Sequence, residues 1–266
     1  MIIKHRYALD TNRKIIKILQ KRNIEYNIES GILIFTIEED NQYFDEISNQ
    51  VKIKSIVSKE FSRKELDEAS WYSVRSIWTV GYPLPEDEYI EATFDQNRYC
   101  LNCRSNQFQI NSYIIKPFEW KTRFFCTLFW QDRVLMVSAK CLSILKESQI
   151  LGYTEKPVLN KKKEEYDDII QILPNELIDG IDYDASRIEY IWACPVCGTK
   201  KYFPPKGQLT IHKEAFNNIN SDYLSTVTQF GKYGSNRINI ISKKLYDTII
   251  RNNLDKNLEI EPIKII

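Results

Sequence analysis

Four of the six cysteines occur as two C-x-x-C pairs, Cys100 with Cys103 and Cys194 with Cys197. A two-residue spacer lets the chain curl so that both thiolates of a pair face one metal ion about 2.3 Å away. Two such pairs complete the tetrahedral coordination of Zn²⁺ and leave no open position for water or substrate. The spacing therefore predicts one structural zinc ion per chain, held by all four thiolates.

The turns around the two pairs are not equally favourable for binding metal. Pro195 restricts φ early in the second turn, and Gly198 can adopt a left-handed conformation after the last cysteine. The first pair is followed by Arg104, for which the same conformation costs about 1 kcal/mol. Ordinary reduced thiols and dithiol redox sites are the alternatives, although no βαβ redox setting is visible around either pair.

One copy of a weak internal repeat follows each cysteine pair. Residues 133–158 and 237–263 each begin with Arg and continue to a serine that can cap a helix, Ser138 or Ser242. Each segment then has the pattern of an amphipathic helix and of a strand that ends in Pro and a β-branched residue. The shared order of cysteine pair, strand, cap, helix and strand indicates two degenerate copies of one unit that share a metal ion.

The first 60 residues predict a separate module. The expected order of strand, helix, strand, strand, helix and strand is that of a ferredoxin-like fold. Asp10 or Thr11 can cap the first helix, and Ser30 with Gly31 can form the turn between the second and third strands. Strands are expected at residues 2–9, 24–29, 32–37 and 51–57, and the second helix at 40–49.

Ser62 and Glu65 have the spacing of a capping box, which marks the start of a new segment. We therefore divide the chain into a ferredoxin-like module, residues 1–62, and a larger double-knuckle zinc-binding domain, residues 63–266, in which each knuckle is one C-x-x-C turn. The predicted fold class is α+β. The N-terminal ferredoxin-like module is followed by a two-repeat αβ domain, and the two repeats share a four-cysteine zinc site. Within this domain the repeat halves cover about 71–160 and 161–266, strands are expected at 89–95, 107–116, 123–130 and 133–138, and helices at 139–149 and 243–254.

The paired knuckles, the S-x-K start of each repeat helix and the closing segment 258–262 resemble the double-CXXCG motif family of bacterial immunity proteins, which belong to polymorphic toxin systems. The resemblance covers roughly residues 71–266, and Arg104 stands where the first motif of the family has glycine. It implies a cytoplasmic protein that binds and silences a cognate toxin. The individual residues that match are Cys100, Cys103, Cys194, Cys197 and Gly198.

Other residues that could carry chemistry lack a visible activating partner. His5 and His212 are the two histidines of the chain, and no G-x-S-x-G pattern accompanies them. Asp179, Asp182 and Asp184 surround a glycine turn, but no glutamate follows at the spacing of a calcium loop. We therefore predict no catalytic residues and no cofactor besides the structural Zn²⁺.

The remaining cysteines and the aromatic strand residues are expected in the core. Cys126 and Cys141 lie among apolar residues, which is typical of inert buried thiols. An aromatic run could stack bases on an exposed sheet, but few Lys or Arg residues lie near it, so core strands explain it better. This run comprises Trp120, Phe124, Phe125, Phe129 and Trp130.

Composition excludes several classes of protein. Of the 266 residues, 43% are hydrophobic and 27% charged, which supplies a core and excludes a disordered chain. The net charge is +1, so no global field favours nucleic acid or an anionic membrane. Charged residues interrupt the N-terminus before a secretory signal can form, and no run approaches the roughly 18 apolar residues of a membrane span. We expect a cytoplasmic protein without a membrane partner, whose cysteines are reduced or bind metal.

These observations favour a non-catalytic, zinc-stabilised immunity protein whose partner is a cognate toxin domain encoded nearby. The closed thiolate site and the isolated histidines argue against an enzyme, whereas binding requires a stable scaffold and a shaped surface. A zinc-stabilised nucleic-acid-binding protein is the alternative, and an enzyme of unrecognised type comes third. A basic face would favour the nucleic-acid alternative, and a deep pocket with ionisable groups would favour the enzyme. The oligomeric state is left open.

Overall fold

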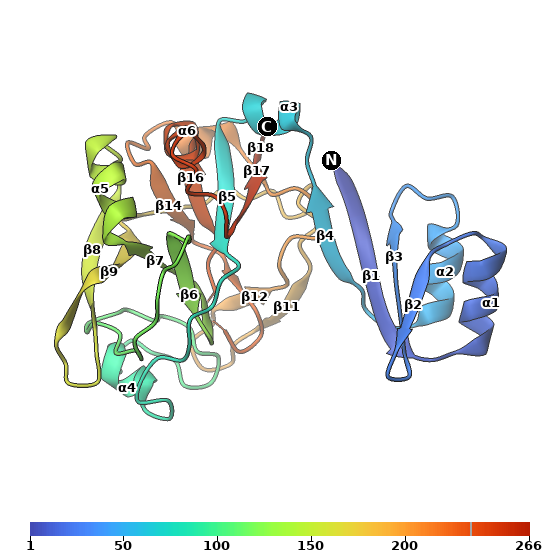
Figure 1. The fold of residues 1–266 in the computed structure, drawn as a ribbon, viewed down its shortest axis with the longest axis horizontal. Coiled ribbons are helices and arrows are strands. Elements are labelled where there is room, and N and C mark those ends of the chain that lie inside the picture. The colour runs from blue at the N-terminus through green and yellow to red at the C-terminus, as the bar shows by residue number, and fades with distance from the viewer. Residues whose placement is uncertain (235) are drawn as a thin grey trace. The chain divides into compact units, whose positions relative to one another are not determined.

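The computed structural model describes residues 1–234 and 236–266, apart from the side chain of Asp132. The chain divides into two compact units, Met1–Glu68 and Ala69–Ile266. Both units combine helices with strands, so the described chain is of the mixed α+β class (Figure 1). The first unit ends with the short helix Arg63–Glu68, whereas the sequence analysis places the boundary before this helix, at residue 62. None of the helices in the described ranges has the length and apolar character that a membrane crossing requires.

The first unit is built on a four-stranded antiparallel sheet. Its elements are β1 (Ile2–Asp10), α1 (Arg13–Lys21), β2 (Tyr26–Glu29), β3 (Ile32–Glu38), α2 (Phe44–Val51), β4 (Ile56–Glu60) and α3 (Arg63–Glu68). The strands are ordered β2-β3-β1-β4. Alternate residues of β3, such as Leu33 and Phe35, point to one face and are buried there. Helices α1 and α2 pack on this face, where Leu19 and Ile47 join the same apolar core (Figure 1).

Polar side chains start two helices of the first unit. Asn12 caps α1 in place of the expected Asp10 or Thr11, because its side-chain oxygen accepts two backbone N–H groups of the first turn. The predicted capping box is present at α3. The backbone N–H of Ser62 donates to Glu65 Oε2 at 2.8 Å, and that of Glu65 donates to Ser62 Oγ at 3.2 Å.

The second unit contains two larger sheets, each with one helix packed on it. Its elements are β5 (Trp71–Ser76), α4 (Tyr89–Thr93), β6 (Phe125–Leu128), β7 (Gln131–Ser138), α5 (Ala139–Glu147), β8 (Tyr153–Leu159), β9 (Glu165–Pro174), β10 (Glu176–Ile178), β11 (Tyr190–Ala193), β12 (Lys200–Tyr202), β13 (Thr210–Ile211), the 3-10 helix η1 (Lys213–Phe216), β14 (Tyr223–Thr226), β15 (Gln229–Phe230), β16 (Asn239–Ser242), α6 (Lys243–Arg251), β17 (Leu258–Pro262) and β18 (Lys264–Ile265). The sheets are ordered β6-β7-β9-β8 and β10-β14-β16-β5-β17, with smaller sheets β11-β12-β15 and β13-β18. Helix α5 packs on β7 and β9, α6 packs on β16 and β5, and the two helices contact each other (Figure 1).

In each larger sheet, a strand from elsewhere in the chain lies between the two strands that flank the helix, and we call it the inserted strand. In the first, β9 lies between β7 and β8, the strands that precede and follow α5. In the second, β5 lies between β16 and β17, the strands that precede and follow α6. All four pairings are antiparallel. Both sheets therefore contain a strand–helix–strand segment whose two strands enclose one further strand.

The inserted strand has the same register in both sheets. One of its residues pairs with the residue before the helix-capping serine and with a proline of the strand after the helix. These residues are Ile170 with Val137 and Pro157 in one sheet, and Tyr72 with Ile241 and Pro262 in the other. A shift of one residue would turn every side chain of the inserted strand to the opposite face of its sheet, so the shared register is a specific correspondence between the two sheets.

Helices α5 and α6 start and end alike. Ser138 Oγ and Ser242 Oγ each accept the backbone N–H three residues later at 3.2 Å. Each helix has nine residues and is followed by a left-handed residue, Gln149 with φ 52° and Asn253 with φ 54°. Backbone hydrogen bonds across these residues close the last turn of each helix.

Three predicted strands are wrong in whole or in part. Residues 89–95 contain helix α4, whose buried residues lie four apart, a helical spacing. Residues 107–116 make isolated bridges rather than a strand, because their partners are single residues of other loops and strands. The strand expected at 51–57 begins at Ile56, because Lys52 ends α2 in the left-handed conformation.

Replacing the capping serine of α5 tests this part of the fold. Ser138→Ala removes the acceptor for a backbone N–H of the first turn, so the free energy of unfolding is expected to fall by about 1 kcal/mol. Urea denaturation followed by circular dichroism measures the change. Ser143→Ala, an exposed change on the same helix, is the control and should stay within about 0.5 kcal/mol of the parent. Equal stabilities of the two variants would contradict the cap.

Candidate metal centre

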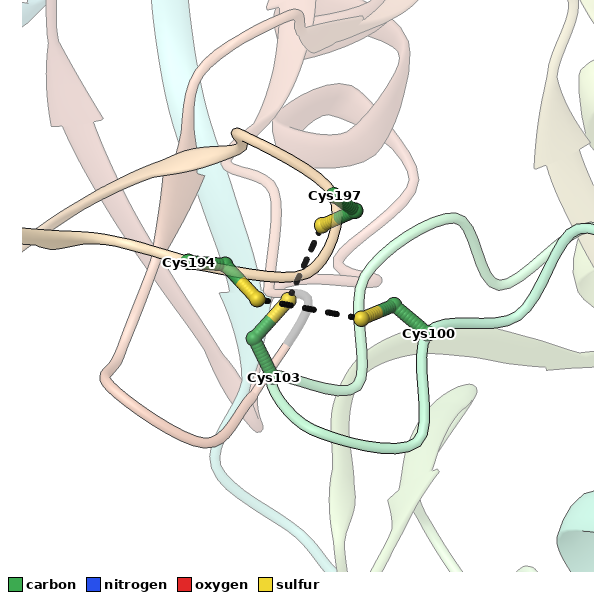
Figure 2. A group of neighbouring side chains, drawn as sticks. All are labelled: Cys100, Cys103, Cys194 and Cys197. Atoms are coloured by element: carbon green, nitrogen blue, oxygen red, sulfur yellow. Dashed lines mark hydrogen bonds between the residues drawn. The ribbon is translucent and has the colours of Figure 1, made fainter.

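Two loops bring the four predicted cysteines together. Cys100 and Cys103 lie between α4 and β6, and Cys194 and Cys197 lie between β11 and β12. The four Sγ atoms lie within 4.8 Å of one another, and the two loops face each other across the cluster (Figure 2). The Sγ atoms of Cys100 and Cys194 are 3.8 Å apart, and those of Cys103 and Cys197 are 3.5 Å apart. Residues more than 90 positions apart in the sequence therefore form one site.

The two loops share the same backbone hydrogen bonds although their sequences differ. The N–H of the first cysteine donates to the carbonyl five residues later, and the N–H four residues later donates back to the carbonyl of the first cysteine. These bonds join Cys100 to Ser105 and Arg104, and Cys194 to Thr199 and Gly198. The φ angle is 57° at Arg104 and 72° at Gly198. Arg104 thus adopts the conformation that glycine provides in the second loop, at a cost of about 1 kcal/mol.

Polar neighbours of the sulfur atoms are the residues that sequence reasoning missed. Cys103 Sγ lies 3.0 Å from Ser105 Oγ, and Cys197 Sγ lies 3.2 Å from Thr199 Oγ1. The Asn102 amide donates to Cys194 Sγ at 3.3 Å. A hydroxyl or amide that donates to sulfur stabilises the thiolate. The signal in the sequence was a hydroxyl residue two positions after the second cysteine of both pairs.

Burial and hydrogen bonding give the thiols different acidities. Burial raises the pKa of Cys103 to about 12, against the hydrogen bonds from Ser105. Burial also disfavours the Cys194 thiolate, but the Asn102 amide and backbone N–H groups of the loop outweigh it and lower the pKa of Cys194 to about 6. Burial likewise opposes ionisation of Cys197, yet its contacts with Thr199 lower its pKa overall. A divalent cation at the centre would favour the thiolate form of all four.

The sulfur positions fit a tetrahedral metal ion. A Zn–S bond of 2.3 Å places the sulfurs of a regular tetrahedron about 3.8 Å apart, close to the 3.8 and 3.5 Å between facing cysteines. Cys100, Cys103 and Cys194 are buried, whereas Cys197 is exposed. The four cysteines are therefore positioned to bind one metal ion at the edge of the second unit. Because sulfur would fill all four positions, such an ion would stabilise the fold and would not bind substrate.

A buried ammonium group and an indole ring complete the surroundings of the cluster. Lys201 of β12 is fully buried, and its Nζ donates to Gln229 Oε1 at 3.2 Å and to the Gly234 carbonyl. Burial lowers the pKa of Lys201, whereas the nearby cysteine thiolates raise it. Four thiolates around a divalent cation leave two excess negative charges, which a buried ammonium group partly compensates. Trp192 packs against the cysteines.

The other candidate ligands and bases do not join the cluster. His5 is buried in the first unit, where its ring nitrogens lie 2.8 Å from Ser55 Oγ and 3.3 Å from Glu39 Oε2. His212 is exposed beside η1. The carboxylates of Asp179 and Asp182 accept backbone N–H groups of their own loop. Within the described residues, the four cysteines form the one group of three or more His, Cys, Asp and Glu that could hold a metal ion.

The remaining cysteines and aromatic residues divide between core and surface. Cys126 and Cys141 are fully buried, and burial raises the pKa of both thiols, so they stay protonated. Phe125 is also buried, as expected. The expectation that Phe129 and Trp130 belong to the core is wrong, because the turn between β6 and β7 places both rings in solvent, 46% and 54% exposed.

The fold and the site define a two-unit α+β protein with one cluster of four cysteines positioned for a metal ion. No model of a known protein family matches the chain, and no curated protein is found to be related to it.

Metal analysis tests the cluster directly. Protein purified without chelator is expected to contain one metal ion per chain by inductively coupled plasma mass spectrometry, and Cys100→Ser or Cys194→Ser should abolish it. Because exposed Cys197 gives a chelator access, EDTA should remove the ion and lower the melting temperature by about 10 °C or more. Cys141→Ala, a cysteine outside the cluster, should leave the metal content unchanged. Metal-free protein whose stability is insensitive to chelator would refute the site.

Proposed function

We propose that Zn²⁺ occupies the four-cysteine cluster as a structural ion, one per chain. Thiolate ligands, their number and their near-tetrahedral spacing support this choice, because soft thiolate ligands select zinc over the oxygen-binding cations. One cysteine pair precedes β6 and the other precedes β12. The zinc ion thus fastens two loops that the sheets of the second unit do not join directly.

Residues 71–160 and 161–266 are, in our proposal, two copies of one unit that have exchanged their first strands. Each copy has the same order of first strand, cysteine pair, two strands, capped helix and last strand, apart from short added elements. The first strand of each copy, β5 or β9, lies in the sheet of the other copy, and the common register supports a reciprocal exchange. For the first unit we propose a ferredoxin-like module, which the sheet order β2-β3-β1-β4 supports.

The single observation that carries our proposal for function is an exposed aromatic cluster at the tip of the β6–β7 hairpin, formed by Tyr82, Phe129 and Trp130. The ring of Tyr82 lies 4.6 Å from that of Phe129 and 4.5 Å from that of Trp130, between centroids. Trp130 has φ 66°, a left-handed conformation that a bulky residue adopts at a cost of about 1 kcal/mol or more. The chain thus tolerates strain while three aromatic rings face solvent. Large aromatic side chains of this kind anchor protein–protein interfaces.

We infer that the protein is a non-catalytic immunity protein, which binds a cognate bacterial toxin domain and silences it by occlusion. The resemblance of the cysteine pairs to the double-CXXCG family supports this function, and the hairpin-tip aromatic cluster supplies an anchor for the toxin. A zinc ion with four sulfur ligands has no position for a substrate, which supports binding rather than catalysis. In this proposal the protein acts in the bacterial cytoplasm, and its partner is encoded by a neighbouring gene.

Co-expression with the neighbouring toxin domain tests the function. We expect a complex that survives gel filtration and restores growth of cells that make the toxin. Trp130→Ala and Phe129→Ala should each weaken the complex by tenfold or more, because each removes a buried anchor from the interface. Tyr190→Ala, which removes an exposed aromatic side chain from β11, is the matched control and should leave affinity unchanged. Biolayer interferometry with the purified toxin domain measures these effects.

A second set of variants separates occlusion from catalysis. Joint replacement of His5 and His212 by Ala should leave both the complex and the protection intact. Loss of protection in the double variant, with folding and complex formation unchanged, would identify an enzyme. Absence of any complex with the neighbouring gene product would refute the immunity function.

A further inference from the structure

The second unit contains a cavity of about 850 Å³ between its two halves. Phe94, Phe108 and Tyr113 line it from residues 71–160, and Leu173, Asn175 and Arg237 line it from residues 161–266. Its volume lies in the range of small-molecule binding sites. A ligand of that size would touch both halves at once.

Three arginines line the cavity: Arg98, Arg133 and Arg237. Arg133 and Arg237 occupy matching positions, each five residues before the serine that caps the following helix. Among the side chains that the structure describes, the lining contains no carboxylate, histidine, cysteine or lysine. The cavity therefore offers positive charge without a general acid or base, which suits binding of an anion and not catalysis.

Arg237 carries the most specific signal. Its Nη1 donates to the backbone carbonyls of Thr226 and Val227, both at 2.6 Å, and these bonds fix the guanidinium plane. No carboxylate among the described side chains pairs with this guanidinium. Burial lowers the pKa of Arg237, although the group stays charged. A partly buried guanidinium without a carboxylate gains free energy when an anion binds to it.

The remaining lining suits a ring with hydrogen-bonding edges. Phe108 is 54% exposed, and the Arg98 guanidinium lies over its ring at 4.7 Å from the centroid. Arg98 also pairs with Asp95 at 3.6 Å, so its charge is partly compensated and its planar group serves as a stacking surface. Side-chain amides line the same cavity, and these offer both donors and acceptors: Asn106, Gln107, Gln109, Gln131, Asn175 and Asn236.

We propose that this cavity binds a mononucleotide, with the phosphate at Arg133 and Arg237 and the base against Phe108. Arginine matches the geometry of phosphate, aromatic and guanidinium planes stack on bases, and amides bind base edges. The cavity is much larger than an inorganic phosphate ion, which leaves room for the sugar and the base. This activity goes beyond toxin binding and stands or fails independently of it.

Isothermal titration of the full-length, metal-loaded protein tests the proposal. The probes are AMP, GMP, CMP and UMP, with adenosine, guanosine, cytidine, uridine and inorganic phosphate as partial ligands. We expect at least one nucleotide to bind with one-to-one stoichiometry and at least tenfold more tightly than phosphate or its own nucleoside. Arg237→Gln and Arg98→Gln should each weaken nucleotide binding tenfold or more, and Phe108→Ala should weaken nucleotide binding but not phosphate binding.

Arg75→Gln is the control, because Arg75 pairs with Glu259 across β5 and β17 and does not line the cavity. Its nucleotide affinity should equal that of the parent. If Arg237→Gln does not fold, Arg98→Gln and Phe108→Ala decide, since both side chains are largely exposed. Failure of all four nucleotides to bind at millimolar concentration overturns the proposal, and so does equal binding of phosphate and nucleotide. Unchanged affinity in the folded cavity variants, or tighter binding of a short RNA than of any mononucleotide, also overturns it.

Discussion

The meeting of four cysteine thiols between two loops is the constraint on which this part of the second unit depends, because three of the thiols are buried and their ionised forms would repel one another. Hydrogen bonds to Cys194 and Cys197 favour their ionisation, whereas burial favours the protonated thiol of Cys103. The segment between α4 and β6 contains isolated bridges but no helix or strand in its described residues. The cysteine cluster and the buried side chains of Tyr113 and Ile115 hold this segment, whose residues line much of the cavity.

Sequence reasoning succeeded where the signal was local. Cysteine spacing, the capping box at Ser62 and the serine caps of the two nine-residue helices each depend on a few neighbouring residues. It failed at residues 89–95 and 107–116, because short apolar runs have no period that separates a strand from a helix or a loop. The exposure of Phe129 and Trp130 was also not predicted, since a turn residue in the left-handed conformation is expected to be Gly or Asn and not Trp. The strand insertion depends on pairing between residues far apart, which leaves no trace in local patterns.

The cavity and the aromatic cluster share one structural origin. Strand β7 begins directly after the aromatic turn, and Arg133 lies near its start. The same hairpin thus presents apolar rings on the outside and a guanidinium group on the inside. Occupation of the cavity would restrain β7 and could in this way alter how rigidly the hairpin holds Phe129 and Trp130. Partner binding and ligand binding would then be coupled, with equal effect in both directions.

Strand insertion also sets the order in which the chain can fold during synthesis. Strand β5 leaves the ribosome early, but its partner β16 begins more than 160 residues later. At ordinary translation rates this interval lasts roughly 10 to 30 s. Throughout that time the nascent chain carries an unpaired strand, with apolar Trp71, Tyr72 and Val74, whose edges can pair with other chains. Docking of β5 in this topology is therefore a late step that follows synthesis of β16, and the interval before it is the one in which the unpaired strand is most exposed to aggregation.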